Sequence, residues 1–292
     1  MEIGTLLTPQ QAGHTDEYLQ SMAARYATPA VNLQSLFGRC CLAATPAFRG
    51  ADGVDLDRLR ADMEAYAERV VADPNADQLG LDPLLVAEAA VTLQKAGIEV
   101  PALNRMIGKI AEELSGQPDP VRSLGRVRLV ARSLRELGRQ LKSAAPHRAA
   151  ADLLQKPHAW LTAPVQELTD LIDHLMADGA RLDADQSDLF SLIALGELRN
   201  YRVDIASKAL RLVIRQGIIE ENTVEALRFV ATQRRRDGGY GFANPFRDSE
   251  TAAPPPDLIF HLPMTLNAVW LFHTVLAGSV NHDAQSGQAV AQ

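Results

Sequence analysis

The sequence of 292 residues has few aromatic side chains, few cysteines and no excess of positive charge. Aromatic residues make up only 5% of the chain and most of its apolar residues are alanine and leucine, which disfavours an all-β sandwich or barrel. The net charge is −7, from 29 basic and 36 acidic residues, and this disfavours binding to nucleic acid. No apolar run reaches the roughly 18 residues of a membrane span and no secretory signal opens the sequence, so we expect a soluble cytoplasmic protein without membrane insertion.

The two cysteines, Cys40 and Cys41, are adjacent in the sequence. Neighbouring cysteines rarely satisfy disulfide geometry, so we expect no cross-linked framework, in keeping with a reducing compartment. Buried, inert thiols are one interpretation of the pair. A nucleophile or a thiolate metal ligand is the other.

What the sequence does contain is a succession of short amphipathic patterns at helical spacing, separated by Gly and Pro turns. No strand is required anywhere. The patterns predict helices at 16–26, 55–71, 83–95, 101–114, 121–137, 164–176, 185–198, 205–215, 223–232 and 263–276. Residues 1–15 are predicted to be flexible and 281–292 to be a disordered tail, because the tail is small, polar and without period. Residues 16–280 are predicted to form a single helical domain.

Three of the predicted helices end in similar short sequences, LQKAG, LRELG and LMADG. Their glycines stand at positions 97, 138 and 179, so the two intervals between them are equal. A helix-loop-helix unit of about 40 residues is typical of hairpin arrays. The pattern therefore predicts an all-α fold built from a curved array of helical hairpins.

The most distinctive segment is EALRFVATQRRRDGGYGFANP, followed after a loop by FHLPMTLNAVWLFH. It resembles the repeat of terpenoid cyclases and protein prenyltransferase β subunits, in which an apolar helix end and Gln precede Asp-Gly-Gly, an aromatic residue and Gly. The matching residues are Phe229, Gln233, Asp237, Gly238, Gly239, Tyr240 and Gly241, with a looser match at Thr265, Leu266, Ala268 and Leu271. The resemblance covers about residues 225–272 and implies an α/α toroid, in which this turn has a structural role.

The catalytic motifs of those families are missing from the chain. There is no Asp-x-Asp-Asp acid motif and no Asp-Asp-x-x-Asp magnesium motif. The adjacent Cys40 and Cys41 do not match the zinc ligands of protein prenyltransferases or of lanthionine-forming cyclases. The resemblance therefore implies a fold without a catalytic set, and we expect no metal and no cofactor.

Four residues are candidates for catalysis. His261 precedes the predicted inner helix at 263–276, so we expect it at the mouth of a central cavity as a general acid or base. Asp188 lies one turn into the helix at 185–198 and is the candidate acidic partner, with N-capping as the alternative role of the acidic residues there. Tyr240 and Tyr201 are expected to shape the cavity wall, although core packing also explains Tyr201.

Three further residues are candidates for substrate binding. Arg236, in an arginine triplet, suits a phosphate or carboxylate, with a solvated helix end as the alternative. Asp257 ends the long loop 244–257, which is either a lid or a connection. His273 lies too far along the chain from His261 for the two to share one helix face as a local metal pair, and core packing is its alternative role.

These observations lead to two functional hypotheses. The first is a metal-independent biosynthetic enzyme with a central-cavity site, a cyclase or related enzyme that acts on a modified peptide or isoprenoid precursor by acid–base chemistry. Its partners would be a peptide or hydrophobic small-molecule substrate and other biosynthetic proteins. The alternative is a non-catalytic helical-repeat module that binds a peptide or partner protein on its concave face.

Overall fold

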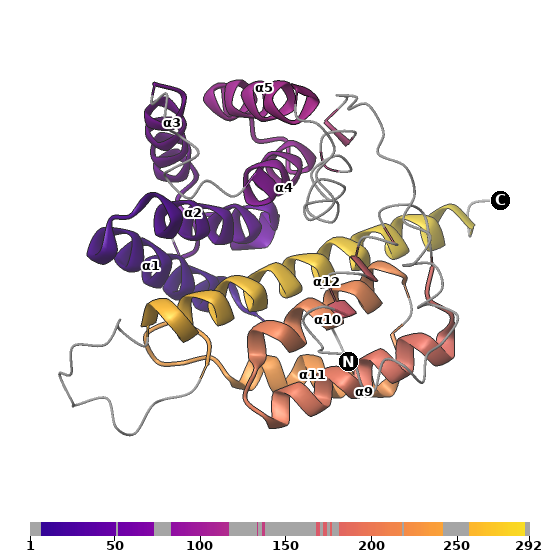
Figure 1. The fold of residues 1–292 in the computed structure, drawn as a ribbon. Coiled ribbons are helices and arrows are strands. Elements are labelled where there is room, and N and C mark those ends of the chain that lie inside the picture. Colours follow the sequence, from indigo (N-terminus) through magenta and orange to yellow (C-terminus); the bar gives the residue numbers. More distant parts are fainter. Residues whose placement is uncertain are drawn as a thin grey trace.

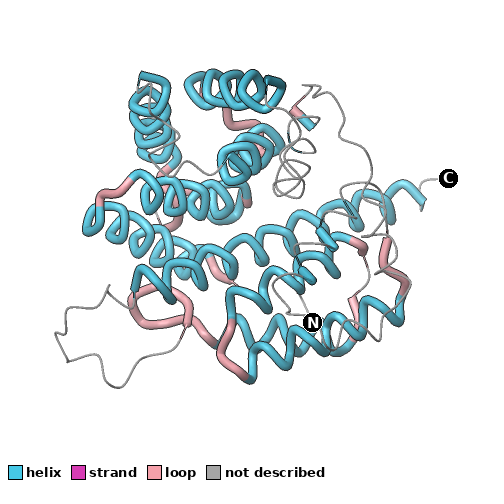
Figure 2. Tube along the Cα trace, in the orientation of Figure 1, coloured by secondary structure: helices cyan, strands magenta, loops and turns pink. Residues whose placement is uncertain are grey.

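The computed structural model describes residues 7–50, 52–72, 83–116, 181–217, 219–241 and 257–289, together with residues 133, 136, 137, 168, 169, 172, 173 and 176. Within these parts the protein is helical, and the β pairing consists of two isolated bridges, Arg49 to Val54 and Arg234 to Tyr240. Figure 2 shows helices joined by short loops, without a strand among the described residues. The predicted all-α class is confirmed.

The observed helices agree closely with those expected from the sequence. They are α1 (Pro9–Tyr26), α2 (Pro29–Ala44), α3 (Leu56–Ala72), α4 (Pro83–Lys95), α5 (Pro101–Gly116), α9 (Ala184–Arg199), α10 (Val203–Arg215), α11 (Glu221–Thr232) and α12 (Leu262–Ala289), with short turns η2 (Pro46–Phe48) and η5 (Asp257–His261). The predictions for α3, α4, α5, α9, α10 and α11 agree at both ends to within two residues. The predicted helices at 121–137 and 164–176, and the glycines at 138 and 179, fall mostly or wholly outside the described residues.

The first helix begins earlier than the sequence analysis expects. Thr8 and Gln11 form a capping box, in which each side chain accepts the backbone N–H of the other, at 3.2 and 2.9 Å, and Pro9 occupies the first turn. Thr15 is fully buried on this helix. The structure thus places residues 9–15, which the sequence assigned to a flexible segment, in a helix. At the other end, the bounds of α12 take in residues 281–289, which were assigned to the disordered tail.

The helix α2 was not predicted. Its start carries the same signal as α1, because Thr28 caps it by accepting the Val31 N–H at 3.3 Å and Pro29 follows. Most of its side chains are buried, since α1, α3, α4 and α12 all pack against it. Its half-buried residues lie near its start and at its last residue, and residues 35–43 between them are buried on all sides.

The packing order places four helices inside the molecule. α4 packs on α2, α2 on α12, and α12 on α10. α1 packs against α2, α5 against α3 and α4, and α9 against both α10 and α11. In Figure 1, the long helix α12 lies between α2 on one side and α10 on the other. The last helix of the chain is thus in contact with the second.

The Asp-Gly-Gly-Tyr-Gly turn at 237–241 joins α1 to the start of α12. Gly238 has a φ of +89°, and a Cβ there would stand 2.1 Å from the carbonyl oxygen of His14. The Thr15 hydroxyl donates to the Gly238 carbonyl at 2.8 Å. On the other side, the Tyr240 N–H donates to the hydroxyl of Thr265 at 2.8 Å. The turn requires glycine because the backbone of α1 approaches it so closely.

Candidate functional site

The turn brings two of the predicted catalytic residues, Tyr240 and His261, close together. The Thr265 hydroxyl, which accepts from the Tyr240 N–H, donates in turn to the His261 carbonyl at 2.7 Å. A Cβ on Gly241 would lie 3.1 Å from His261 Cδ2. Both side chains are buried, burial raises the pKa of Tyr240, and its hydroxyl has no hydrogen-bond partner among the described residues. These two residues lie in packed surroundings at the end of the turn.

The other predicted catalytic residues lie on or beside α9, which packs against α10 and α11. Asp188 is half-buried, and its Oδ1 accepts a hydrogen bond of 2.7 Å from the side chain of Asn222 on α11. Tyr201 is 59% exposed just after the end of α9, with a φ of +64°. The structure therefore places Asp188 in a link between two helices and Tyr201 at the surface.

The predicted substrate-binding residues lie apart from one another. Arg236 is exposed in the turn after α11. Asp257 opens the π-helical turn η5, and its side chain falls outside the described residues. His273 follows His261 by more than three helical turns, which corresponds to about 18 Å along a helix, so the two imidazoles belong to different parts of the molecule.

His273 lies near a group of buried and half-buried polar residues, and its imidazole senses the charges of Glu88 and Arg215. We name this group the interior polar cluster, and its members are Glu88, Ser133, Asp173, Arg215 and His273. The Ser133 hydroxyl donates to Glu88 Oε1 at 2.6 Å. Arg215 pairs with Asp173 at 2.9 Å and approaches the second oxygen of Glu88 at 4.0 Å. Because Glu88 belongs to α4 and Arg215 to α10, the cluster connects helices that are far apart in the sequence.

The surroundings of His273 keep its imidazole neutral at pH 7. Burial lowers the pKa of His273 to about 4, the positive charges of Lys95 and Arg215 act in the same direction, and the negative charge of Glu88 opposes them. Its Nδ1 is buried and finds no hydrogen-bond partner within the described ranges. A neutral imidazole with an unused ring nitrogen can accept a proton or a hydrogen bond from a bound molecule.

A second arginine, Arg211, lies one helical turn before Arg215 on α10. Its guanidinium carbon stands 3.3 Å from the centroid of the Trp270 ring of α12, and only 4% of the residue is exposed. Trp270 in turn packs edge-on against Phe37 of α2, with the ring centroids 4.7 Å apart. Burial and the charge of Arg215 lower the pKa of Arg211 to about 9, so it stays protonated at neutral pH.

The two cysteines are free and buried on α2, in agreement with the interpretation as buried thiols. Burial raises the pKa of Cys40 to about 12 and that of Cys41 well above its usual range. The thiolate is therefore strongly disfavoured at neutral pH, and this argues against the interpretation as a nucleophile.

Glu88, Arg211 and Arg215 were not predicted as site residues, although each carries a recognisable signal in the sequence. Glu88 interrupts the apolar run LLVAEAAV of α4. Arg211 and Arg215 are four apart within LRLVIR and so share one face of α10. A charged residue inside an apolar helical run is rarely buried without a partner or a purpose, and that rule would have singled out all three.

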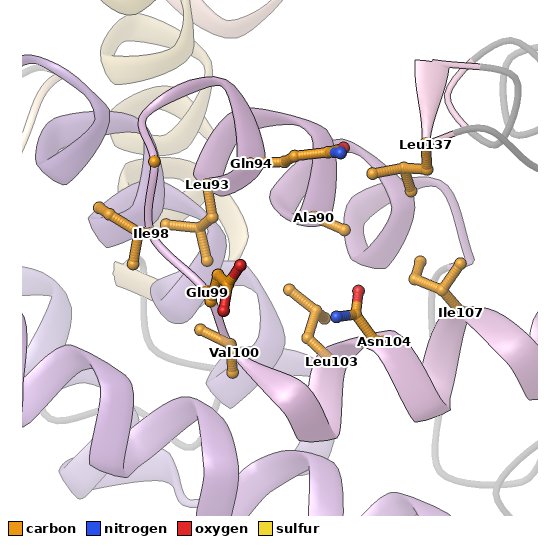
Figure 3. Close-up of a pocket in the computed structure, with 11 residues that line it drawn as sticks. Ala90, Leu93, Gln94, Ile98, Glu99, Val100, Leu103, Asn104, Ile107 and Leu137 are labelled. Carbon is orange, nitrogen blue, oxygen red and sulfur yellow. The ribbon is translucent and has the colours of Figure 1, made fainter.

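A separate groove lies at the surface between α4 and α5. It has a volume of about 270 Å³ and combines apolar side chains with the polar groups of Gln94, Glu99 and Asn104. Figure 3 shows Leu103, Asn104 and Ile107 rising from α5 toward the side chains of α4. The remaining residues that line it are Ala90, Leu93, Gly97, Ile98, Val100 and Leu137.

The described part of the chain holds no group of three or more His, Cys, Asp or Glu residues arranged to bind a metal ion. None of the helices in those same ranges combines the length and apolar character needed to cross a membrane. Comparison of the chain with protein-family models, with curated proteins and with solved structures gave no match.

Proposed function

We propose that the chain is a metal-independent biosynthetic enzyme that acts by acid–base chemistry at the interior polar cluster, within an α/α toroid. The packing order supports this architecture, since α2, α4, α10 and α12 lie inside and α12 returns to α2. The resemblance of the turn at 237–241 to the repeat of toroidal enzymes supports it as well. Fold alone does not assign a function, so the proposal depends on the cluster.

The observation that carries the proposal is the convergence of ionisable groups from three buried helices. Glu88 comes from α4, Arg215 from α10 and His273 from α12. Removing a charged group from water costs several kcal/mol unless its partners compensate, so a purely structural core is better served by apolar side chains. A titratable group with a perturbed pKa beside charged neighbours, as His273 is here, is characteristic of catalytic sites.

Four members of the cluster have a chemical role in this proposal. Neutral His273 accepts a proton from the substrate and, as the imidazolium, returns it to the product, while the Glu88 carboxylate, oriented by Ser133, stabilises the imidazolium through its negative charge. Arg215 stabilises negative charge that develops between these steps. Phe37 and Trp270 supply an apolar wall for a modified peptide or an isoprenoid-like substrate, and the reaction is a cyclisation or a related rearrangement.

A metabolite-consumption experiment tests the proposal while the substrate is still unidentified. The full chain is incubated with small-molecule extracts, and its products are followed by mass spectrometry beside those of His273→Gln and Glu88→Gln. We expect a compound that the wild type consumes and that both variants convert at least about 100-fold more slowly, as removal of the general base, or of the carboxylate that stabilises its protonated form, predicts. Circular dichroism verifies that the variants are folded.

Asp188→Asn and His261→Gln serve as matched variants, because they represent the catalytic pair expected from the sequence. Under the present proposal Asp188→Asn retains turnover, since that carboxylate contacts Asn222 between α9 and α11. If Asp188→Asn loses turnover while His273→Gln keeps full activity, the active site contains Asp188 and His261 instead. Equal turnover by all four variants and the wild type would refute both assignments.

The groove between α4 and α5 supports the second candidate function, a helical-repeat module that binds a peptide. Its mixture of apolar and polar side chains suits one extended segment that carries an apolar side chain. Peptides selected by display against the wild-type chain should lose binding to Asn104→Trp, which fills the groove, and keep it with Arg236→Ser at an exposed site elsewhere. Selected peptides that ignore Asn104→Trp would eliminate this candidate.

A further inference from the structure

We infer that Arg211 and Ser207 form a subsite that binds an oxyanion, a carboxylate or a phosphate, on the ligand of this protein. The inference rests on the proposed function, since the subsite adjoins the interior polar cluster and defines a class of substrate for it. Its basis is the geometry of Arg211, the neighbours of that residue and a second buried arginine that serves as a comparison.

The position of Arg211 leaves hydrogen-bond donors unused. A guanidinium carbon 3.3 Å from the ring centroid of Trp270 means that the aromatic ring covers one face of the group. The N–H groups of a guanidinium lie in its plane, so stacking leaves them available at the edge. Two of the nitrogens, Nε and Nη1, are buried, and no residue of the described segments accepts a hydrogen bond from them.

A second unused donor belongs to the same helix face. Ser207 lies four residues before Arg211 on α10, which places the two side chains one turn apart on one side of the helix. Ser207 is fully buried, and its hydroxyl likewise has no hydrogen-bond partner in the part of the chain that the structure describes. A hydroxyl and a guanidinium are both donors to an oxyanion, and a single bound group can satisfy the two.

The nearby carboxylates have other partners. Glu88 accepts from Ser133, and Asp173 pairs with Arg215. The negative charges of Asp173 and Glu88 raise the pKa of Arg211, and the positive charge of Arg215 lowers it. Arg211 remains protonated at neutral pH. The guanidinium edge therefore offers a full positive charge to an incoming anion.

Arg39 shows how this chain treats an arginine that has a structural role. Arg39 on α2 is 3% exposed, close to the 4% of Arg211. Its Nε pairs with Asp16 of α1 at 2.8 Å and its Nη1 with Asp62 of α3 at 2.6 Å. Arg39 thus joins three helices through carboxylates of the chain, whereas the described residues supply no acceptor to the corresponding atoms of Arg211.

Binding of simple anions to the full chain tests the inference. Thermal unfolding and titration calorimetry are performed with inorganic phosphate and with acetate, each against potassium chloride at the same ionic strength. We expect the Tm to rise with the concentration of at least one oxyanion. The anion that binds more tightly identifies the ligand group as a phosphate or a carboxylate. Arg211→Met should weaken that binding by about 10- to 100-fold, the loss typical of a hydrogen-bonded ion pair.

Two further variants keep the test decisive. Ser207→Ala removes only a hydroxyl and should weaken binding several-fold, and it serves if Arg211→Met does not fold. In the absence of anions, Arg39→Met should lower the Tm because it leaves Asp16 buried and unpaired, whereas Arg211→Met should leave the Tm unchanged or raise it. No response to either oxyanion, or equal affinity in wild type and both subsite variants, would overturn the inference.

This experiment separates the subsite from the proposed function. Anion binding is measured without turnover. If no anion binds but His273→Gln still loses turnover, the subsite is refuted and the proposed enzyme is retained. Anion binding that depends on Arg211, without any turnover, removes the enzyme and leaves a binding site. A fall in Tm for Arg211→Met as large as that for Arg39→Met would assign Arg211 a structural role.

Discussion

Acidification should destabilise this protein through His273. In the folded state burial and the charges of Lys95 and Arg215 hold the pKa of His273 at about 4, against an ordinary value of 6.5 in the unfolded chain. Between these two values the unfolded state binds more protons than the folded state, so the free energy of unfolding falls as the pH falls. The contribution is fully present above about pH 6.5 and lost by pH 4.

The size of the effect follows from the difference between the two pKa values. One pKa unit corresponds to about 1.4 kcal/mol, so the buried imidazole accounts for roughly 3 kcal/mol of lost stability at pH 4. Total stabilities of domains are commonly about 5–15 kcal/mol, so the loss is a large fraction of the whole. Glu88 opposes the shift, and its replacement by Gln should lower the pKa of His273 further.

Urea unfolding of the wild type and His273→Gln at a series of pH values between about 7 and 4 measures this contribution directly. Carboxylates titrate in both proteins, so the difference between their curves isolates His273. His14→Gln is the matched control, because His14 is exposed on α1. Parallel curves for the wild type and His273→Gln, or an NMR titration of the His273 ring near its ordinary pKa, would refute the reasoning.

Three further predictions concern the turn at 237–241 and its contacts. Gly238→Ala should cost about 3 kcal/mol or more, because its Cβ would meet the His14 carbonyl at 2.1 Å and φ is +89°, whereas Gly196→Ala, on a helix with open space, should be neutral or stabilising by about 0.5–1 kcal/mol in chemical denaturation. Tyr240→Phe should change stability by less than about 1 kcal/mol, since the hydroxyl it removes has no partner among the described residues, and a clear loss in calorimetry would contradict this. His261→Ala should lower the Tm by an amount equivalent to about 1–3 kcal/mol, because the ring is only 4% exposed, and an unchanged Tm would argue that it is not part of the packing.

Residue patterns in the sequence predicted some features of the candidate site and missed others. The sequence indicated a sharp turn at Gly238 and Gly239. The structure shows why glycine is needed there, because the backbone of His14 and the ring of Tyr18, both on α1, approach the two residues closely. His261 was predicted to act as an acid or base because it precedes an inner helix. The structure packs His261 against the turn, and it places His273, further along the same stretch of chain, where the charges of Glu88 and Arg215 act on it.

Local chemistry fixed the helices of this protein. Thr, Asp and Pro at helix starts and glycine at helix ends act within a few residues through caps and backbone conformation, so the bounds of α4, Pro83–Lys95, could be predicted. The helix α2 was not predicted, although Thr28 and Pro29 give it the same start signal that Thr8 and Pro9 give α1.

Tertiary structure alone decided which side chains meet. Glu88, Arg211 and His273 lie on three helices that are far apart in the chain, and no spacing rule operates over such separations. Their convergence depends on how α4, α10 and α12 pack, which minimises exposed apolar area over the whole molecule rather than within one segment. Arg211 is visible in the sequence as a charged residue within an apolar run. The same packing buries it beside Trp270, where its Nε and Nη1 find no acceptor in the described segments.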